Sequence, residues 1–341
     1  MLHFDSDYME GAHPLILECL ERSNYDKNPG YGSDDYCRRA ADRIRQLCGC
    51  PGAAVYFLPG GTQANATVID FLLKNYQGVL SAYTGHINVH EAGAVEAYGH
   101  KILTLSHTDG KLSPSDIDAY MDAFVSDPTH EHMVEPGMVY ISHPTEYGAS
   151  YSLGELEELH RVCRGHSLSL YMDGARLGYA LAARGSDLSL EQIASLCDAF
   201  YIGGTKVGAL FGEAVVFPDA ERSRGFFTLM KRHGAVTAKG WLLGLQFEAL
   251  LEGDTYTDIA RHADLLADSL RDGLKAKGYR IFTESSTNQV MVVVPNAKLS
   301  EISKDATYSY WERFDSSSSV VRFAVSWATK ESDVHKLLSL M

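Results

Sequence analysis

The sequence predicts an α/β protein built mainly on a doubly wound, mostly parallel sheet of seven strands flanked by helices. Seven short apolar segments alternate with segments whose apolar residues recur at helical spacing, which is the pattern of strands joined by crossover helices. After Pro218 the alternation gives way to long helical segments. The chain has 341 residues, of which 45% are hydrophobic, so it is long enough to bury the core that such a sheet requires.

Two helices and a loop of turn-forming residues precede the first predicted strand. Apolar residues recur at helical spacing over 14–22 and again over 35–48, where Asp and Ser stand before the helix as caps. The segment 28–34 between them is rich in Gly, Asn and Pro, so we predict a loop there with Tyr31 at its centre.

Strands and helices then alternate as far as residue 217. Each predicted strand is a short apolar run, and the seven lie at 53–58, 78–83, 101–105, 138–142, 168–172, 199–202 and 213–217. The helices predicted between them lie at 62–74, 91–98, 114–124, 153–163 and 190–196.

The last third of the chain predicts a smaller α+β domain. Helices are expected at 220–231, 239–251 and 257–277, and strands or extended segments at 289–294, 307–314 and 320–325. A short helix is expected after the first of these strands, and a further helix at the C-terminus. No linker of low complexity separates this part from the rest, so the boundary is expected in a helix or at its end. We therefore predict a large α/β domain at 1–250, which includes the N-terminal segment, and a small domain at 251–341.

Charge and hydropathy argue against several classes of partner. The 30 basic and 44 acidic residues give a formal net charge of −14, so we expect no nucleic-acid partner. No segment has the roughly 18 uninterrupted apolar residues of a membrane span, and residues 1–7 do not resemble a secretory signal. We therefore expect no membrane partner and a cytoplasmic location. The six cysteines show no paired framework, which predicts structural thiols.

The sixth predicted strand is followed by a lysine in an apolar turn bounded by glycines. Lys206 follows Gly203, Gly204 and Thr205 and precedes a second apolar segment. Partial desolvation would lower the pKa of this lysine and make available the neutral amine that a Schiff base requires. Taken alone, the pattern also fits a surface lysine whose stem lies on apolar neighbours.

Polar residues follow the other strands at the same edge of the sheet, where open parallel sheets bind their ligands. After the first strand, Gly61 and Thr62 open a helix whose free N–H groups either bind a phosphate or form a plain helix cap. The second strand is followed by His86, His90 and Glu91. Their spacing is not that of H-E-x-x-H, so we predict no metal site there and favour a histidine ring lying against a flat cofactor.

Asp173 lies where the fifth strand ends, and Arg176 follows three residues later. An isolated aspartate at this place is often only a helix cap. Together with Lys206 and the phosphate-binding turn, however, it completes the set that pyridoxal 5′-phosphate (PLP) needs: an amine for attachment, a carboxylate for the ring nitrogen and donors for the phosphate. We therefore predict PLP as the cofactor.

With these segments, the chain resembles the threonine aldolase group of the β-eliminating lyase family, PLP enzymes of fold type I. The resemblance runs from Phe4 to the C-terminus. Asp-Gly-Ala-Arg at 173–176, followed later by Gly-Thr-Lys at 204–206, is its most specific part. It is supported by the segments 4–7, 31–34, 60–65 and 86–93 and by Arg322.

The resemblance implies a role at the cofactor for each matched residue. Lys206 would hold PLP covalently, Asp173 would pair with its ring nitrogen, and His86 would stack on its ring. Gly61 and Thr62 would bind the phosphate, and Thr205 would also contact the cofactor.

The resemblance also implies how the amino-acid substrate is held. Ser6, Arg176 and Arg322 match the positions that grip the substrate carboxylate, with Arg176 also close to the cofactor. A bidentate guanidinium suits a carboxylate and keeps its charge at any working pH. Tyr31 would reach the site from a neighbouring subunit, so a homodimer or homotetramer with sites at the subunit interface is implied.

One turn departs from the family pattern. Where many members have Asn-Thr-His-Asn, this chain has Pro-Thr-Glu-Tyr at 144–147, so that Glu146 takes the place of the histidine and His143 lies before it. The base that accepts the β-hydroxyl proton is therefore open between His86, Glu146 and Glu91.

The resemblance implies retro-aldol cleavage of a β-hydroxy-α-amino acid. L-Threonine or L-allo-threonine, giving glycine and acetaldehyde, is the leading expectation. β-Elimination and cleavage of phenylserine-type substrates are alternatives on the same scaffold. A catalytically idle scaffold protein is the alternative from another class.

Overall fold

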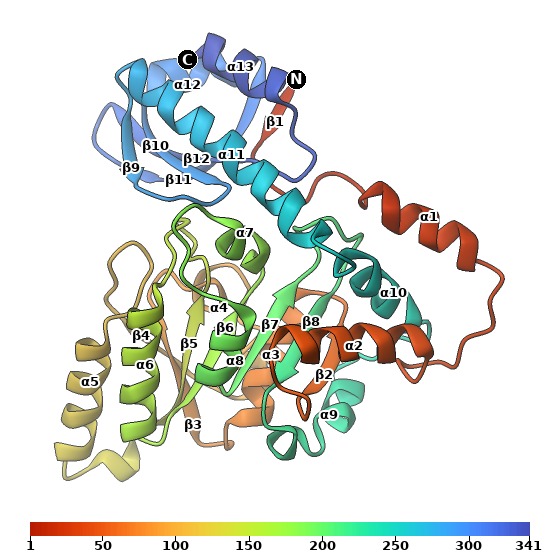
Figure 1. The fold of residues 1–341 in the computed structure, drawn as a ribbon. Helices are drawn as coiled ribbons and strands as arrows, with labels where there is room; N and C mark the ends of the chain where they lie inside the picture. Colours follow the sequence, from red (N-terminus) through yellow and green to blue (C-terminus); the bar gives the residue numbers. More distant parts are fainter.

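The computed structural model describes all 341 residues and contains two sheets (Figure 1). The larger has seven strands in the order β2-β8-β7-β6-β5-β3-β4, in which β8 alone runs antiparallel to its neighbours. This confirms the predicted seven-stranded, mostly parallel sheet. Its strands are β2 (Ala54–Leu58), β3 (Gln77–Ala82), β4 (Ile102–Leu105), β5 (Glu135–Ser142), β6 (Ser169–Asp173), β7 (Ala199–Gly203) and β8 (Glu213–Phe217).

Helices cover both faces of this sheet because successive strand residues point to opposite sides. In β5, for example, Ile141 packs into one apolar core and Tyr140 into the other. Around the sheet lie α1 (Pro14–Ser23), α2 (Asp35–Leu47), α3 (Gly61–Leu72), α4 (His86–Val89), α5 (Pro114–Ser126), α6 (Leu153–Gly165), α7 (Leu177–Ala182), α8 (Leu190–Leu196), α9 (Phe226–Arg232) and α10 (Trp241–Leu250).

The smaller sheet has five strands in the order β1-β11-β12-β10-β9. Its elements are β1 (Leu2–Phe4), α11 (Thr255–Ala276), β9 (Arg280–Thr283), β10 (Gln289–Pro295), α12 (Asn296–Ile302), β11 (Ala306–Arg313), β12 (Ser318–Ala324) and α13 (Glu331–Leu340). Strand β1 pairs in parallel with β11, so the N-terminal strand belongs to this sheet, and both termini lie in this part of the molecule (Figure 1). The domain boundary near residue 250 remains a prediction. Strand β1 belongs to the small sheet, although the prediction placed the N-terminal segment in the large domain.

Two predicted helices do not form as expected, because the backbone enters the left-handed region within them. The helix expected at 91–98 is absent: α4 ends at Val89, Ala92 and Gly93 have φ values of 50° and 76°, and only a 3₁₀ turn, Glu96–Tyr98, follows. The helix expected at 220–231 breaks at Gly225, whose φ is 95°, into a 3₁₀ turn and α9. Strands β1 and β9 and helix α7 were not predicted.

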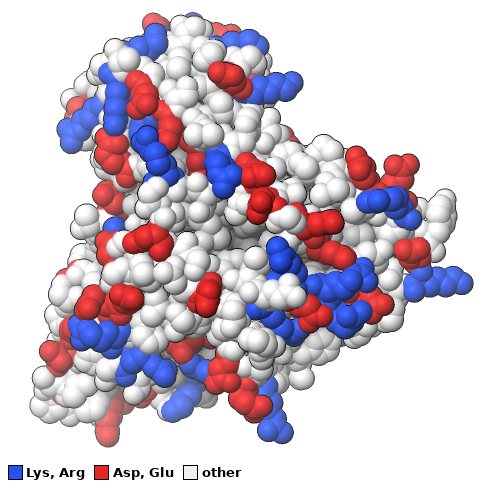
Figure 2. Space-filling model, in the orientation of Figure 1, with Lys and Arg blue, Asp and Glu red and all other residues white.

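Basic and acidic side chains are mixed over the face shown in Figure 2. None of the helices is both long enough and apolar enough to cross a membrane.

Candidate active site

A cavity of about 370 Å³ lies at the carboxyl ends of the central strands. It collects most of the residues that the sequence predicted: Gly61, Thr62, His86, Glu146, Asp173, Arg176, Thr205 and Lys206. A second cavity, of about 590 Å³, adjoins it and shares several of its walls, including His86, Glu146 and Lys206. We call them the inner and the outer cavity. Arg322 lines the outer one.

Lys206 lies in a tight turn after β7. Glycine is required at the start of this turn, because a Cβ on Gly203 would lie 2.4 Å from the carbonyl oxygen of Ala175. The hydroxyl of Tyr179 donates a hydrogen bond of 2.6 Å to the Lys206 carbonyl and fixes the backbone. Burial, followed by the positive charge of Arg176, lowers the pKa of Lys206 to about 8. The neutral amine that was expected from the sequence is therefore more accessible near neutral pH than in an ordinary lysine.

Asp173 lies at the end of β6 and is almost completely buried. One carboxylate oxygen accepts hydrogen bonds from Tyr140 (2.7 Å) and Asn65 (2.8 Å). The other oxygen accepts from the hydroxyl of Tyr201 and from the backbone N–H of Ala175. Burial alone would raise the pKa of Asp173, but the charge of His86 and these hydrogen bonds lower it. The carboxylate is thus kept ionised inside the protein.

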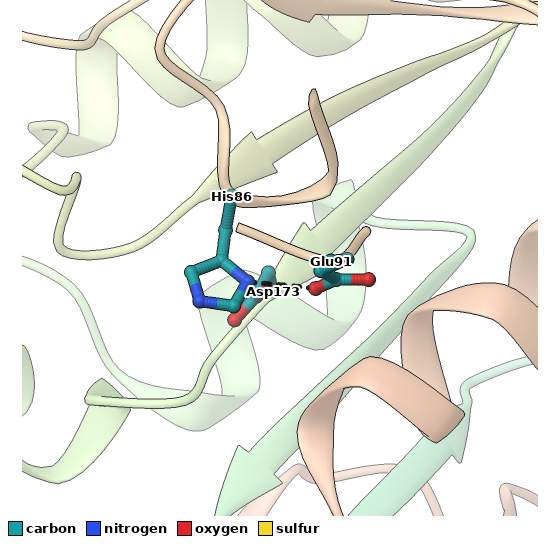
Figure 3. A group of neighbouring side chains, drawn as sticks. All are labelled: His86, Glu91 and Asp173. Carbon is teal, nitrogen blue, oxygen red and sulfur yellow. Dashed lines mark hydrogen bonds and ion pairs between the residues drawn. The ribbon is translucent and has the colours of Figure 1, made fainter. Parts of the chain in front are cut away.

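His86 is connected to Asp173 through a hydrogen-bonded chain of side chains. Its Nδ1 lies 2.7 Å from Oε1 of Glu91 (Figure 3). Asn65 donates both to that oxygen (2.7 Å) and to Asp173. Because a carboxylate oxygen only accepts, His86 donates from Nδ1, and its Nε2 is left for the cavity. Ligand atoms of His86, Glu91 and Asp173 lie within 4.8 Å of one another, and in the structure hydrogen bonds already occupy them.

The three candidate bases are not equivalent. Glu91 lies behind His86 and lines neither cavity, so it orients the imidazole instead of facing a ligand. Glu146 lines both cavities, and its Oε1 accepts from the backbone N–H of His86 (2.9 Å) and from Ser142 (2.6 Å). Burial raises the pKa of Glu146. His143 is buried beneath the turn, where its Nδ1 accepts from the backbone N–H of Tyr151.

Arg176 is held by an ion pair that the sequence did not reveal. Its Nε and Nη2 donate to the two carboxylate oxygens of Asp7 at 2.7 and 2.9 Å, and Asn288 also donates to Asp7 at 2.8 Å. Burial opposes ionisation of Asp7, yet Arg176, with Lys206 next, keeps the pKa of this carboxyl well below its usual range. The pair orients the guanidinium and leaves its Nη1 without a hydrogen bond to Asp7.

Replacing Asp7 by asparagine is expected to destabilise the protein by about 3–5 kcal/mol, because Arg176 would be buried without its counter-ion. Urea denaturation near neutral pH measures this loss. A carboxyl with a lowered pKa stabilises the fold above its unfolded pKa of about 3.9 and loses that contribution as the pH falls further. The difference between wild type and variant should therefore shrink below about pH 4. Asp258→Asn is the control, since the pair of Asp258 with Arg261 is exposed; an equal loss in both variants would contradict the role of Asp7.

Three predicted residues, Arg322, Ser6 and Tyr31, do not line the inner cavity, and Ser6 lines neither the inner nor the outer one. Arg322 donates to Gln289 and Ser309, and its Nε is buried without a partner. The hydroxyl of Ser6 is also buried and unpartnered. Tyr31 lines a separate cavity of about 420 Å³, with the amine of Lys231 4.3 Å from its ring, and is not part of the inner cavity within one chain.

The inner cavity has the set of side chains and backbone donors that PLP needs. Helix α3 begins at Gly61 with no side-chain cap, so its first N–H groups are free for a phosphate. A Cβ on Gly61 would lie 3.1 Å from the hydroxyl of Tyr201, a tight contact that glycine avoids. Lys206 and the ionised Asp173 lie in the same cavity. These residues could hold the phosphate, the aldehyde carbon and the ring nitrogen respectively.

Several residues of the site were missed. Asn65 lies in a segment that carried the resemblance but had no role assigned to it, and Tyr140 and Tyr201 looked like apolar strand residues. Tyr8 and Glu213 line the inner cavity, and neither belongs to a pattern that could have indicated this.

Comparison with known proteins identifies the class. The model of the β-eliminating lyase family matches residues 19–297, so the chain belongs to this family of PLP-dependent lyases. At lower similarity, the structure of Thermus thermophilus aspartate aminotransferase superposes with a TM-score of 0.75 and 16% identity, over 100% of this chain and 90% of that one. It shows the same fold, that of fold type I PLP enzymes.

Within the class, the similar proteins are threonine aldolases. The low specificity L-threonine aldolase of a Pseudomonas species is 30% identical over 339 residues, covering 98% of this chain and 95% of the relative. That of Pseudomonas aeruginosa is 29% identical over 343 residues, with the same coverage. The structure of Leishmania major threonine aldolase superposes with a TM-score of 0.96 and 39% identity, covering 100% of this chain and 98% of that one.

Proposed function

We propose that this protein cleaves a β-hydroxy-α-amino acid by a retro-aldol reaction, with L-threonine or L-allo-threonine giving glycine and an aldehyde. The observation that supports it best is the convergence of Lys206, Asp173 and Arg176 in one cavity. Similarity to threonine aldolases over nearly the whole chain supports the same reaction.

The residues of the inner cavity would have two roles: attachment of PLP and stabilisation of the charge on its ring nitrogen. Lys206 would bind PLP covalently, and the N-terminus of α3, with Thr62 and Thr205, would bind its phosphate. Bound PLP supplies an electron sink for the electron pair of the bond that breaks. The buried, ionised Asp173 would keep a proton on the ring nitrogen.

The substrate carboxylate would lie between the two cavities. Arg176 lines both cavities and Arg322 lines the outer one, and both are permanently charged donors. The buried hydroxyl of Ser6 has no partner and is a further donor. Fixing the carboxylate fixes the orientation of the bond to be broken, and orientation is a large part of the rate.

Two groups are placed to accept the β-hydroxyl proton. Nε2 of His86 is left for the cavity, because Nδ1 is held by the Glu91 carboxylate behind it. Glu146 lines both cavities, and its raised pKa suits a group that takes up and returns a proton. Both remain candidates, whereas Glu91 acts through His86.

Incubation with L-threonine and separately with L-serine tests the reaction. We expect glycine and acetaldehyde from threonine, and no keto acid or ammonia from either substrate. Keto acid as the main product would show β-elimination instead. A preference for phenylserine over threonine would favour the aromatic substrate class, and no product from any of them would favour a scaffold protein.

We further propose a homo-oligomer with sites at the subunit boundary, and a cytoplasmic location. The first is supported by Tyr31, which lies outside the inner cavity of its own chain. A molecular mass equal to that of a single chain in analytical ultracentrifugation would contradict the homo-oligomer. The second is supported by six cysteines that are all unpaired, as in reducing compartments, and cell fractionation tests it.

A further inference from the structure

Glu213 is a buried carboxyl without a counter-ion in the wall of the inner cavity. It begins β8, is 3% exposed and lines the same cavity as Gly61 and Thr62. No Lys, Arg or His nitrogen lies within ion-pair distance of it. An ionised carboxylate in this position would repel an anion bound at the N-terminus of α3.

The hydrogen bonds of Glu213 connect it to a hydroxyl that lines the cavity. Its Oε1 lies 2.7 Å from Oγ1 of Thr205, and its Oε2 accepts from the backbone N–H of Gly204 at 3.1 Å. Oγ1 of Thr205 also accepts from the backbone N–H of Gly212 at 3.0 Å. If Glu213 is ionised, Thr205 must use its only proton to donate to the carboxylate.

Protonation of Glu213 reverses this hydrogen bond. The carboxylic acid then donates to Oγ1 of Thr205, and the hydroxyl proton of Thr205 is free to point into the cavity. Protonation of Glu213 thus removes a negative charge from the cavity wall and frees the Thr205 hydroxyl to donate to a phosphate. The acid can still accept from Gly204, so the local backbone does not need to change.

We propose that Glu213 is the residue that couples cofactor binding to proton uptake: it is neutral when the phosphate of PLP is bound, and it positions the Thr205 hydroxyl as a phosphate donor. Glu213 is in this sense a positioning residue. The proposal rests on PLP binding in the inner cavity and concerns a step separate from the cleavage reaction.

The surroundings of Glu213 are consistent with a neutral form. The ionisable groups that act on it or respond to it come from β6, β7, the Lys206 turn and α11: Asp173, Tyr171, Tyr201, Lys206 and Tyr256. Burial raises the pKa of Glu213 to about 8, and Thr205 and Lys206 only partly offset this effect. In the cofactor-free protein Glu213 is therefore expected to ionise as the pH rises above its raised pKa, in a range that it shares with Lys206, and proton uptake on binding is expected there.

Calorimetry of the full-length, cofactor-free protein with pyridoxamine 5′-phosphate tests the proposal, because this compound cannot attach to Lys206. Titrations at pH 9 in buffers of different ionisation enthalpy give the number of protons taken up. Wild type should take up about one proton more than Glu213→Gln, whose amide can make the same two hydrogen bonds without titrating. Between pH 8 and 9.5 the affinity of wild type should fall by up to about tenfold per pH unit relative to the variant.

Three controls isolate the phosphate and the position. Pyridoxamine, which has no phosphate, should show the same proton uptake with wild type and Glu213→Gln. Glu157→Gln, on the exposed side of α6, should behave as wild type. Thr205→Val should weaken binding of pyridoxamine 5′-phosphate by about 10- to 100-fold at pH 7, and binding of pyridoxamine much less.

Equal proton uptake by wild type and Glu213→Gln would overturn the proposal while leaving the cofactor assignment intact. If Glu213→Gln does not fold, the pH dependence of wild type and the Thr205→Val comparison decide the question instead. A wild-type affinity that does not fall above pH 8 would then overturn it. Absence of binding of either compound to wild type would overturn the cofactor assignment, and this proposal with it.

Discussion

Replacing Lys206 by alanine is expected to abolish the PLP adduct that borohydride fixes on the wild-type protein and to lower the rate of threonine cleavage by about 10³-fold or more, as for loss of a residue that forms a covalent bond in the reaction. The variant can still bind PLP through the phosphate and ring contacts, but without attachment. No other lysine lines the inner or the outer cavity, so no neighbouring amine can replace Lys206. Peptide mass mapping after reduction locates the adduct, and steady-state kinetics give the rate.

Lys101→Ala is the matched control, because Lys101 is exposed and lines neither cavity. It should keep both the adduct and the rate. An adduct on another lysine in wild type, or full activity in Lys206→Ala, would contradict the assignment on which the proposed reaction depends.

Replacing Asp173 by asparagine is expected to leave PLP attached to Lys206 but to lower kcat strongly. Removing one partner of a buried charged pair costs about 3–5 kcal/mol, which corresponds to about 10²–10⁴-fold if the whole cost appears in the transition state. The amide cannot hold a positive charge on the ring nitrogen. Its NH₂ group would also face the donor Asn65, so a lower melting temperature is expected as well.

Tyr140→Phe separates the charge of Asp173 from its hydrogen bonds. This variant removes one donor to the carboxylate and keeps the charge, so its loss of kcat should be much smaller. Equal losses in the two variants would show that the hydrogen-bonded structure around Asp173, and not its charge, determines the rate.

The sequence was most informative where a local pattern has one physical meaning. The seven strands could be predicted because their apolar runs are short and are bounded by turn residues, and Lys206 and Asp173 because both follow such runs. Strand β1 could not be predicted, since its three residues form a strand only through pairing with β11. The turn at Ala92 could not be predicted either, because a left-handed alanine has no local signature.

The missed residues of the site share one cause, which is distance along the chain. Asp7 and Arg176 form an ion pair across 169 positions, and nothing in either neighbourhood indicates the other. Tyr140 and Tyr201 satisfy the same apolar pattern whether their hydroxyls meet a carboxylate or solvent. Glu213 looked like an ordinary first residue of a strand, and only the cavity shows that it faces the cofactor side.

The pairing of β1 with β11 has a consequence for the order in which the site is assembled on the ribosome. Most of the cofactor cavity is made by residues 59–213, so its frame can form while the chain is still being synthesised. Asp7, however, follows a strand whose only partner begins at Ala306, and its second hydrogen-bond donor is Asn288. Arg176 therefore lacks its ordered counter-ion until nearly the whole chain has emerged. In a nascent chain the cofactor-binding residues can thus be in position before the residues that bind the substrate carboxylate.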